Sequence, residues 1–239
     1  MKQYKISVII RTYNEEKRID EVLDILSRQT YKNSEIIIVD SESTDNTLEI
    51  CRKYDTKIIT INKNDFNYSY ASNIGAENAT GEILCYLSGH SVPNDIDYLE
   101  KMNEVFQDRR VGGCYGEIIA LEDGSWVEKV YHYLGYIKNI NKIKKVVYER
   151  EIHPGILSCS NASVRKKIWS KNKFKEELGM GGEDVELAYR IIKDGYVIAK
   201  VPYLLVKHSH GSNLVKFINE FKAWRKMYNT VEEYINNNP

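Results

Sequence analysis

Short runs of consecutive apolar residues alternate with helical patterns in the first part of the chain. The runs predict strands at 6–10, 35–39, 57–61 and 82–87. A helix with one apolar face is predicted where apolar residues recur at intervals of three and four: Ile19, Val22, Leu23 and Leu26. Further helices are expected at 44–54 and 69–78. Continuously apolar strands that alternate with helices are typical of a parallel sheet covered on both faces.

The alternation loosens after residue 93. Helices are predicted at 96–106, 164–169, 183–193 and 215–234, and a strand at 114–121. A pair of strands is expected on either side of Pro202, and Gly195 is expected to end the helix before it. The segment 126–140 is aromatic and apolar, and 141–151 reads as a charged connector. We expect an α/β fold: a single Rossmann-like domain with a mostly parallel central sheet flanked by helices.

Composition narrows the classes of protein to which the chain can belong. Its 239 residues suit one domain, and 34 basic residues balance 34 acidic ones, which argues against nucleic-acid binding. No apolar stretch reaches the roughly 20 residues of a bilayer span, and no signal peptide is visible at the start. Four cysteines far apart in sequence fit small buried residues in a reducing compartment, so we expect a cytoplasmic location.

Polar residues follow the predicted strands at the edge where open α/β sheets bind ligands. Tyr13 follows the first strand and could lie against a base, and Asp40 ends the second and could accept a hydrogen bond from a base or ribose. The alternative is that Asp40, Ser43 and Asp45 only cap the next helix, with Ser43 or Thr44 as its N-cap. We favour the ligand-binding interpretation for Asp40 and the capping one for the other two.

Several segments together resemble the family-2 glycosyltransferases of the GT-A fold, in the bacterial branch labelled rhamnosyltransferase-like. They are SVIIRTYNEE at 7–16, VDSESTDNT at 39–47, FNYSYASNIGA at 66–76 with ATGEI at 79–83, CSNASVRKKIW at 159–169, GEDVELAYR at 182–190 and VKHSH at 206–210. The resemblance runs from about residue 5 to about residue 225. Any one motif is weak evidence, whereas the set in register is specific.

The resemblance implies that different parts of one domain bind the donor and the acceptor. Residues 1–93 would form the nucleotide-binding half, 94–210 the acceptor-binding half, and 211–239 a C-terminal amphipathic helix. The resemblance places Thr12, Tyr13, Glu15 and Asp40 where the family contacts the nucleoside. We predict that the nucleotide-sugar site also includes Asn73, Ser88 and His90, and that Asn161 and Glu183 lie in the sugar cleft. Asp184 falls where the family places its catalytic base.

Chemistry supports the assignment of Asp184. Displacing a nucleoside diphosphate from an anomeric carbon needs a group that accepts the acceptor's hydroxyl proton. A single base with in-line attack inverts the anomeric centre, whereas retention would favour a second carboxylate as nucleophile. Residues 179–182 read as a flexible glycine-rich approach to the helix that carries Glu183 and Asp184. The alternative is that both acids only complement the helix dipole.

The expected metal site departs from the family pattern. The family usually has an Asp-x-Asp-like motif after the fourth strand, and this chain has Ser88-Gly89-His90. Mg²⁺ avoids imidazole, but Mn²⁺ accepts histidine, so His90 with His208 and His210 could hold a divalent metal, Mn²⁺ or Mg²⁺. Alternatively, a protonated His90 could neutralise the diphosphate without metal, or could be an ordinary loop histidine.

A second departure lies at Ser72, where many relatives carry an arginine that meets the diphosphate. Losing that bidentate donor would weaken donor binding unless another cation replaces it. The candidates are Arg11, Lys63, Arg165 and Lys207.

The last predicted helix carries an aromatic stripe with cations along its edge. The aromatics are Phe217, Phe221, Trp224 and Tyr228, and the cations are Lys216, Lys222, Arg225 and Lys226. The simpler explanation of this stripe is that the helix packs on the domain or in an oligomer. The more specific hypothesis is that it makes peripheral contact with a membrane.

The sequence therefore predicts an inverting, hexosyltransferase-type enzyme that acts in bacterial surface-polysaccharide synthesis. The donor would be a UDP- or dTDP-sugar and the acceptor a glycan or lipid-linked intermediate, at the cytoplasmic face of the membrane. The main alternative is a non-catalytic nucleotide-sugar-binding module with a decayed metal motif. A nucleotidyltransferase or phosphatase would need clustered acids after the fourth strand, and a dinucleotide dehydrogenase would need Gly-x-Gly-x-x-Gly after the first.

Overall fold

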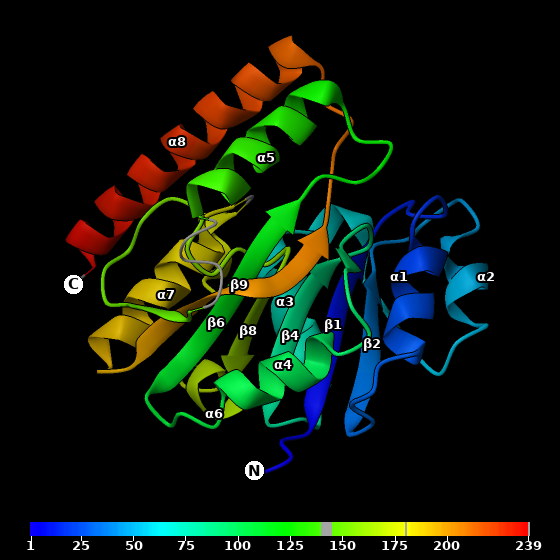
Figure 1. Cartoon of the computed structure of the whole chain (residues 1–239), viewed down its shortest axis with the longest axis horizontal. Helices are drawn as coiled ribbons and strands as arrows, with labels where there is room; N and C mark the ends of the chain where they lie inside the picture. The colour runs from blue at the N-terminus through cyan, green and yellow to red at the C-terminus, as the bar shows by residue number, and fades with distance from the viewer. Residues whose placement is uncertain (140–144, 180, 239) are drawn as a thin grey trace.

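The computed structural model describes residues 1–139, 145–179 and 181–238. One nine-stranded sheet runs through the domain in the order β3-β2-β1-β4-β8-β6-β9-β5, and β7 pairs with β9 (Figure 1). The strands are β1 (Ile6–Thr12), β2 (Ser34–Asp40), β3 (Lys57–Thr60), β4 (Ile83–Ser88), β5 (Val92–Pro93), β6 (Val111–Ile119), β7 (Val147–Glu149), β8 (Ala162–Arg165) and β9 (Val197–Lys207). The helices are α1 (Ile19–Ser27), α2 (Thr47–Cys51), α3 (Tyr68–Glu77), α4 (Tyr98–Val105), α5 (Trp126–Asn139), α6 (Lys166–Trp169), α7 (Glu183–Lys193) and α8 (Leu214–Asn237).

The first half confirms the predicted parallel sheet with both faces covered. Strands β3, β2, β1 and β4 are parallel neighbours. On β1, Val8 and Ile10 join the core beneath α1 and α4, whereas Ile9 points into the opposite core with α3, α6 and α7. Successive strand residues point to opposite faces, so an all-apolar strand is what two covered faces require. The arrangement places the carboxyl ends of β1, β2 and β4 at one edge.

The second half departs from the predicted elements in three places. Strand β8 lies antiparallel between β4 and β6, where a helix from residue 164 was expected, and the helix begins only at Lys166. The pair of strands expected around Pro202 is one strand, β9. Its pairing with β6 is interrupted between Val201 and Val206, so Pro202 lies at an irregularity where no ladder donor is needed.

The connector expected at 141–151 contains a short strand. Residues 147–149 pair with β9 as β7, while 141–144 lie outside the described residues. The aromatic segment before it forms α5.

Helix α2, in the first half, begins at Thr47 with Asn46 as N-cap, so the predicted start at 44 and its Ser43 or Thr44 cap were wrong.

Helix α7 has the predicted bounds, and Gly195 follows its end with a left-handed φ of 86°. Of the glycines before it, which were expected to be flexible, Gly181 and Gly182 are packed, whereas a Cβ on Gly179 would meet nothing within 4 Å. Gly181 and Gly182 have positive φ, and a Cβ on Gly182 would lie 2.4 Å from Val231 of α8. Close approach of α8 therefore requires glycine here. Met180 lies outside the described residues.

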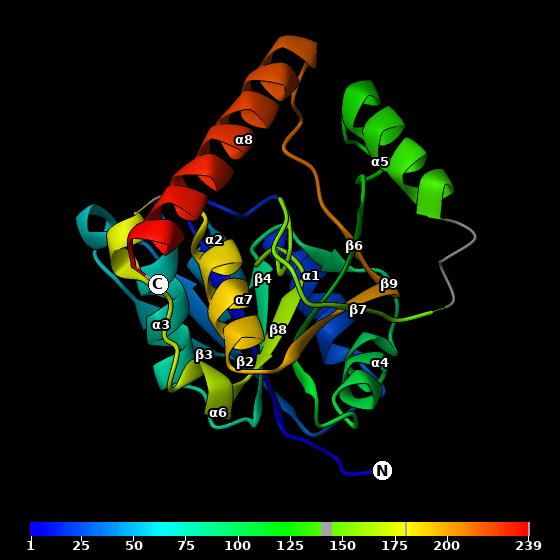
Figure 2. The same cartoon turned by 90° about the vertical axis from the view of Figure 1, so that its left-hand side faces the viewer.

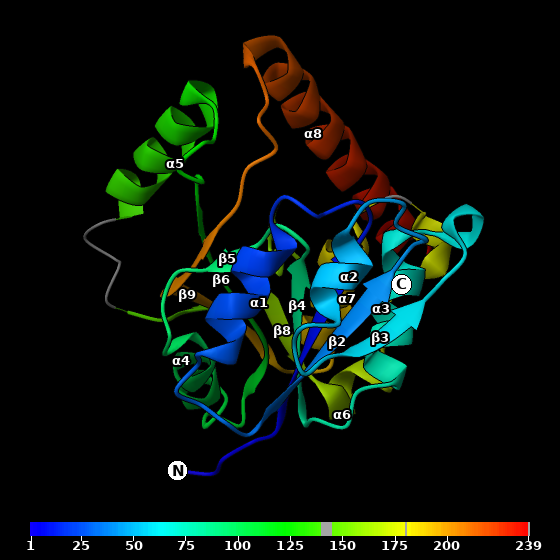
Figure 3. The same cartoon turned by 90° about the vertical axis from the view of Figure 1, so that its right-hand side faces the viewer.

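Helices α5 and α8 extend beyond the sheet on the side of its carboxyl edge. Their N-terminal ends lie near each other, and the helices diverge toward their C-terminal ends (Figures 2 and 3). Helix α8 buries Val231 and Ile235 in its second half, which docks on α7. Among the described helices, none combines the length and apolar character that a bilayer span needs.

Candidate functional site

Asp40 organises the carboxyl edge of β1 and β2. It is fully buried and accepts hydrogen bonds from Thr12 Oγ1 at 3.0 Å, Ser43 N at 2.9 Å and Ser43 Oγ at 2.6 Å. Because α2 begins several residues later, Asp40 does not cap that helix. It fixes the turn that follows β2. Contact between Asp40 or Thr12 and a nucleoside stays a prediction.

Tyr13 stands at the surface beside this turn. Its ring is 39% exposed, and Lys63 Nζ lies 4.4 Å from the ring centroid and 2.5 Å from the hydroxyl. The next residue, Asn14, has a φ of 53° and accepts a hydrogen bond from Thr44 N. An exposed ring of this kind can stack against a planar ligand such as a base, and that contact stays a prediction.

Arg11 lies beside Ser72, the position at which the family resemblance predicts an arginine. Its Nη1 is 3.4 Å from Ser72 Oγ and 3.5 Å from Glu183 Oε1, and its guanidinium lies over the ring of Tyr68. Both partners of the ion pair are nearly buried, with side chains 10% and 6% exposed. Among the four candidate cations, Arg11 alone meets Ser72 in the described contacts. The guanidinium therefore restores a positive charge at this place from a neighbouring strand.

Two of the other candidate cations are used elsewhere. Arg165 donates to the backbone carbonyls of Phe106, Asp108 and Val111, far from the carboxyl edge in sequence and structure. Lys207 lies 3.7 Å from the exposed Glu122.

Asp184 is half-buried in the first turn of α7, directly after Glu183. Burial, and then the neighbouring Glu183 carboxylate, raises its pKa to about 7, against the effects of Arg11 and of backbone donors. The backbone N–H of Val185 donates to its Oδ1 at 2.8 Å. A carboxylate whose pKa lies near neutral is a stronger base than an ordinary aspartate, which is what proton abstraction from a hydroxyl requires.

His90, His208 and His210 form one cluster. The ring centroids of His90 and His208 are 4.6 Å apart, as are those of His208 and His210, and those of His90 and His210 are 5.3 Å apart. One ligand atom from each residue lies within 4.8 Å of the other two. His208 and His210 follow the end of β9, and the structure brings both of their rings beside His90.

Glu15 orients the first histidine. Its Oε1 lies 2.7 Å from His90 Nδ1, and Gly89 packs against the Glu15 side chain so closely that a Cβ would lie 2.5 Å from Glu15 Cγ. His90 Nε2 is buried and has no hydrogen-bond partner among the described residues. A carboxylate on one imidazole nitrogen is the arrangement that aims the other nitrogen at a metal. The implied nucleoside contact of Glu15 stays a prediction.

The cluster fits a divalent transition metal. Burial, and then the charges of His90 and His210, lowers the pKa of His208 well below its usual value, and burial lowers that of His210. Both rings are therefore neutral at pH 7, as metal ligands must be. Three nitrogen donors suit Mn²⁺ or Zn²⁺ better than Mg²⁺. Ser88 hydrogen-bonds Ser91 Oγ at 2.6 Å, at the base of this loop.

Two predicted site residues are held inside the protein. Asn73 donates to Phe174 O and Glu176 Oε1 and accepts from Trp169 Nε1. Asn161 donates to two strand carbonyls, those of Glu117 and Leu204, and accepts from Tyr98 OH. Both side chains are almost fully buried, which favours a structural role. Their contact with the donor or sugar stays a prediction.

Arg11 connects the two parts of the site. Its side chain pairs with Glu183 beside Asp184, and its carbonyl accepts from Gly89 N at 3.0 Å beside His90. The ion pair of Arg11 and the hydrogen bond of Glu15 to His90 were not foreseen. Both join residues far apart in sequence. The pairing of β1 with β4, which sets Arg11 opposite Ser88, places the segments that carry Glu15 and His90 side by side, whereas the Arg11–Glu183 pair depends on the position of α7.

Comparisons with known proteins identify the family of the chain. The model of the family described as glycosyl transferase family 2 matches residues 7–171. The chain is 26% identical to the O-antigen chain rhamnosyltransferase RfbN of Salmonella typhimurium, over 87% of this chain and 67% of that protein. It is 30% identical to the amylovoran biosynthesis glycosyltransferase AmsB of Erwinia amylovora, over 87% of this chain and 70% of that protein.

Solved structures share the fold. The mannosyltransferase PcManGT from Pyrobaculum calidifontis, in complex with GDP-Man and Mn²⁺, superposes with a TM-score of 0.65 at 21% identity, over 87% of this chain and 58% of that one. Residues 1–349 of TarS from S. aureus give a TM-score of 0.66 at 20% identity, over 86% of this chain and 60% of that one. The chain thus spans about three fifths of these structures. With the GT-A architecture and a family model covering more than half of its residues, the chain belongs to glycosyl transferase family 2.

Proposed function

We propose that this chain transfers a hexose from a nucleotide sugar to a glycan or lipid-linked acceptor in bacterial surface-polysaccharide synthesis. The donor would be a UDP- or dTDP-sugar, and the reaction a single displacement at the cytoplasmic face of the membrane. The observation that carries the proposal is Asp184, a half-buried carboxyl with a pKa of about 7 beside the Arg11–Glu183 pair. The activities named for RfbN and AmsB support the same type of reaction.

In the proposed reaction Asp184 accepts the proton of the acceptor hydroxyl. The acceptor oxygen forms a bond to the anomeric carbon as the bond from that carbon to the phosphate oxygen breaks. The electron pair leaves with the nucleoside diphosphate. Attack from the side opposite the leaving group inverts the anomeric centre, because a single displacement forms no glycosyl-enzyme intermediate.

Arg11 is the residue that we assign to the diphosphate. Its guanidinium is fixed beside Ser72 and Glu183, so little side-chain entropy remains to be lost on binding. A preorganised cation stabilises the charge that develops on the leaving group more than it stabilises the neutral sugar. Lys63, beside Tyr13, is placed to meet the nucleoside end of the same ligand.

We assign a divalent metal to His90, His208 and His210, with Glu15 holding His90. The metal would neutralise diphosphate charge when bound. The complex of PcManGT with GDP-Man and Mn²⁺ supports a metal in this fold, and the nitrogen ligands of this chain favour Mn²⁺ over Mg²⁺. Lipid-linked acceptors lie at membrane surfaces, so we also propose peripheral membrane contact through α8.

A panel of nucleoside diphosphates and nucleotide sugars, screened by thermal shift, tests the donor assignment, since a ligand that binds only the folded state raises its melting midpoint. Nucleoside diphosphate release from each stabilising donor, with a mixed glycan acceptor, then separates enzyme from binding module. We expect both stabilisation and release. Stabilisation by donors without release on any acceptor would support the non-catalytic alternative, and no stabilisation by any donor would contradict both.

A further inference from the structure

Exposed apolar side chains gather on α5 and on the first half of α8. Ten of the sixteen large apolar residues that are exposed in the described chain belong to these two helices. They are Trp126, Val130, Tyr131, Tyr133 and Leu134 on α5, and Leu214, Val215, Ile218, Phe221 and Trp224 on α8. Val215 is 69% exposed and Trp126 is 66% exposed. A concentration of this kind on a folded domain marks a surface that binds something.

The fold presents these residues away from the domain. Helix α8 is anchored by its second half, where Val231 and Ile235 are buried, and its first half is exposed around most of its circumference. The rings of Tyr131 and Phe217 lie 5.2 Å apart and join the two helices. The N-terminal ends of α5 and α8 therefore form one projecting surface, which we call the α5–α8 tip (Figures 2 and 3).

The charge on the α8 side of the tip is positive, although the chain as a whole is neutral. On α8, residues 214–226 contain four cations, Lys216, Lys222, Arg225 and Lys226, and a single acid, Glu220. All four cations are exposed. Apolar and aromatic residues next to exposed cations complement a surface that is apolar inside and negatively charged outside, which describes an anionic lipid bilayer.

We propose that the α5–α8 tip inserts into the interface of an anionic membrane. The aromatic side chains suit this layer because they combine an apolar face with a polar tip, and Trp126, Tyr133 and Trp224 are all exposed for it. A second copy of the chain is the competing occupant. It would bring the four α8 cations close to those of the partner helix in a symmetric contact, which is unfavourable.

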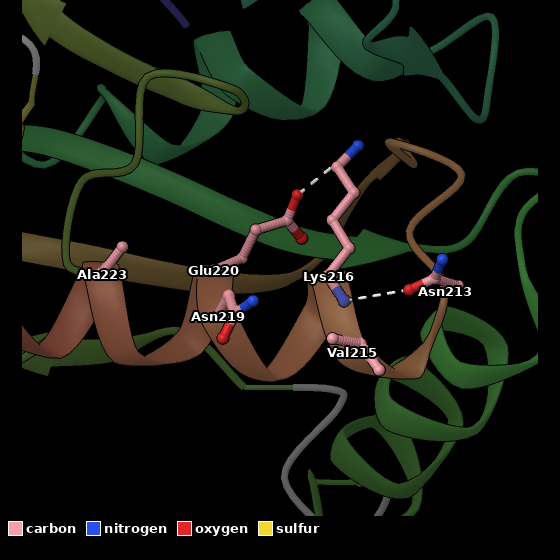
Figure 4. A pocket seen from close by; sticks show the side chains of 6 residues that line it. All are labelled: Asn213, Val215, Lys216, Asn219, Glu220 and Ala223. Atoms are coloured by element: carbon pink, nitrogen blue, oxygen red, sulfur yellow. Dashed lines mark hydrogen bonds and ion pairs between the residues drawn. The ribbon is translucent and has the colours of Figure 1, made fainter.

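This surface lies next to the cluster of His90, His208 and His210, so the inference extends the proposed function to the delivery of the acceptor. The backbone N–H of His210 donates to Glu128 of α5 at 2.7 Å, and Ser212, two residues later, donates to Glu220 of α8 at 2.8 Å. Glu220 also lines an open hollow on the first half of α8, in which Lys216 extends beside it (Figure 4). A lipid headgroup at the tip would enter close to the predicted donor site.

Flotation of the full chain with vesicles tests the proposal without requiring any enzymatic activity. We expect the chain to float with vesicles of phosphatidylcholine and phosphatidylglycerol, and weakly or not at all with phosphatidylcholine alone. Lys222→Gln with Arg225→Gln should weaken binding by roughly 25-fold, since each cation near an anionic surface contributes about a fivefold factor. Trp126→Ser with Phe221→Ser should reduce binding even at low salt.

Ile96→Ser is the matched control, because Ile96 is 47% exposed on another part of the domain. It should float like the parent chain, and circular dichroism of every variant checks the fold. Equal flotation of the tip variants and the parent would overturn the proposal. The proposal would also be overturned if the parent chain floated with neither kind of vesicle and formed a dimer in light scattering that Trp126→Ser with Phe221→Ser dissociates. Loss of flotation with unchanged donor stabilisation separates this inference from the proposed function.

Discussion

The guanidinium of Arg11 lies 3.5 Å from Glu183 and 3.4 Å from Ser72, two residues that come from different helices. Ser72 stands on α3, at the position where the family resemblance predicts an arginine, and Glu183 precedes the proposed base on α7. The end of β1 thus supplies a positive charge beside Ser72. In the proposed reaction this one cation would act on both the leaving group and Asp184.

Replacing Arg11 should weaken donor binding and turnover together. Arg11→Gln removes charged hydrogen bonds worth about 1.5–3 kcal/mol, so we expect roughly a ten- to hundredfold loss in kcat/KM. The double variant Arg11→Ser with Ser72→Arg moves the charge to the neighbouring helix and should recover part of that loss. Steady-state kinetics and calorimetry of donor binding measure both effects.

Lys57→Gln serves as the control for Arg11, because Lys57 is an exposed cation that contacts only Asn78 in the described structure. Unchanged kinetics in Arg11→Gln, or no recovery in the double variant with intact fold, would remove Arg11 from the diphosphate site.

The rate should depend on the protonation of Asp184. Its pKa of about 7 predicts that kcat/KM rises with pH and levels off above neutrality, with roughly a tenfold loss one pH unit below the pKa. Because Arg11 lowers the pKa of Asp184, Arg11→Gln should shift this limb to higher pH. A pH–rate profile of each protein checks that kcat/KM of Arg11→Gln rises at a higher pH than that of the parent chain. A profile that is flat between about pH 5 and pH 8 would contradict the assignment.

Asp184 should also destabilise the folded protein at neutral pH. Its folded pKa of about 7 lies above the unfolded value near 3.9, so the folded state binds more protons between these values and stability falls as pH rises through this window. Asp184→Asn mimics the protonated group and should raise Tm more at pH 8 than at pH 5, by roughly 2–4 °C for each kcal/mol recovered. Differential scanning calorimetry at both values measures the difference. A variant that melts below the parent chain at pH 8 would contradict this account.

The three histidines should make the chain a manganese-binding protein. Excess chelator should abolish activity, and Mn²⁺ should restore it better than Mg²⁺. His90→Ala should abolish the tight binding of Mn²⁺ detected by electron paramagnetic resonance. Glu15→Gln should weaken it by roughly 10- to 100-fold, because Glu15 holds the His90 ring.

Glu16→Gln, next in the chain and bonded to Asn46 instead, is the control and should bind Mn²⁺ normally. Full activity in excess chelator would instead support a protonated His90 that acts without metal.

Local pattern predicts the first half of the fold well, because each parallel strand is buried on both faces and therefore continuously apolar. The elements of the second half are harder to predict from the sequence, for two reasons. Strand β8 has four residues and passes directly into α6, so no turn separates a strand signal from a helix signal. Pro202 breaks the pattern of β9 without breaking the strand, because the pairing with β6 is irregular there.

The candidate site was predictable at the level of motifs and not at the level of contacts. Asp184 stands out as an acid at the start of a predicted helix, and His208 and His210 stand out as histidines that follow a predicted strand. The contacts Arg11–Glu183 and Glu15–His90 depend on which strands become neighbours, and neither partner is near the other in sequence. Asn73 and Asn161 show the converse, since a polar residue inside a motif can serve the packing of the motif itself.

The most direct measurement compares Asp184→Asn with the parent chain in two assays, nucleoside diphosphate release and calorimetric binding of the same donor. Asp194→Asn, at the other end of α7, is the control. We predict that Asp184→Asn lowers turnover by at least about a hundredfold, the scale of general base catalysis, and leaves the donor Kd nearly unchanged. Equal turnover in variant and parent would show that the transfer does not use Asp184.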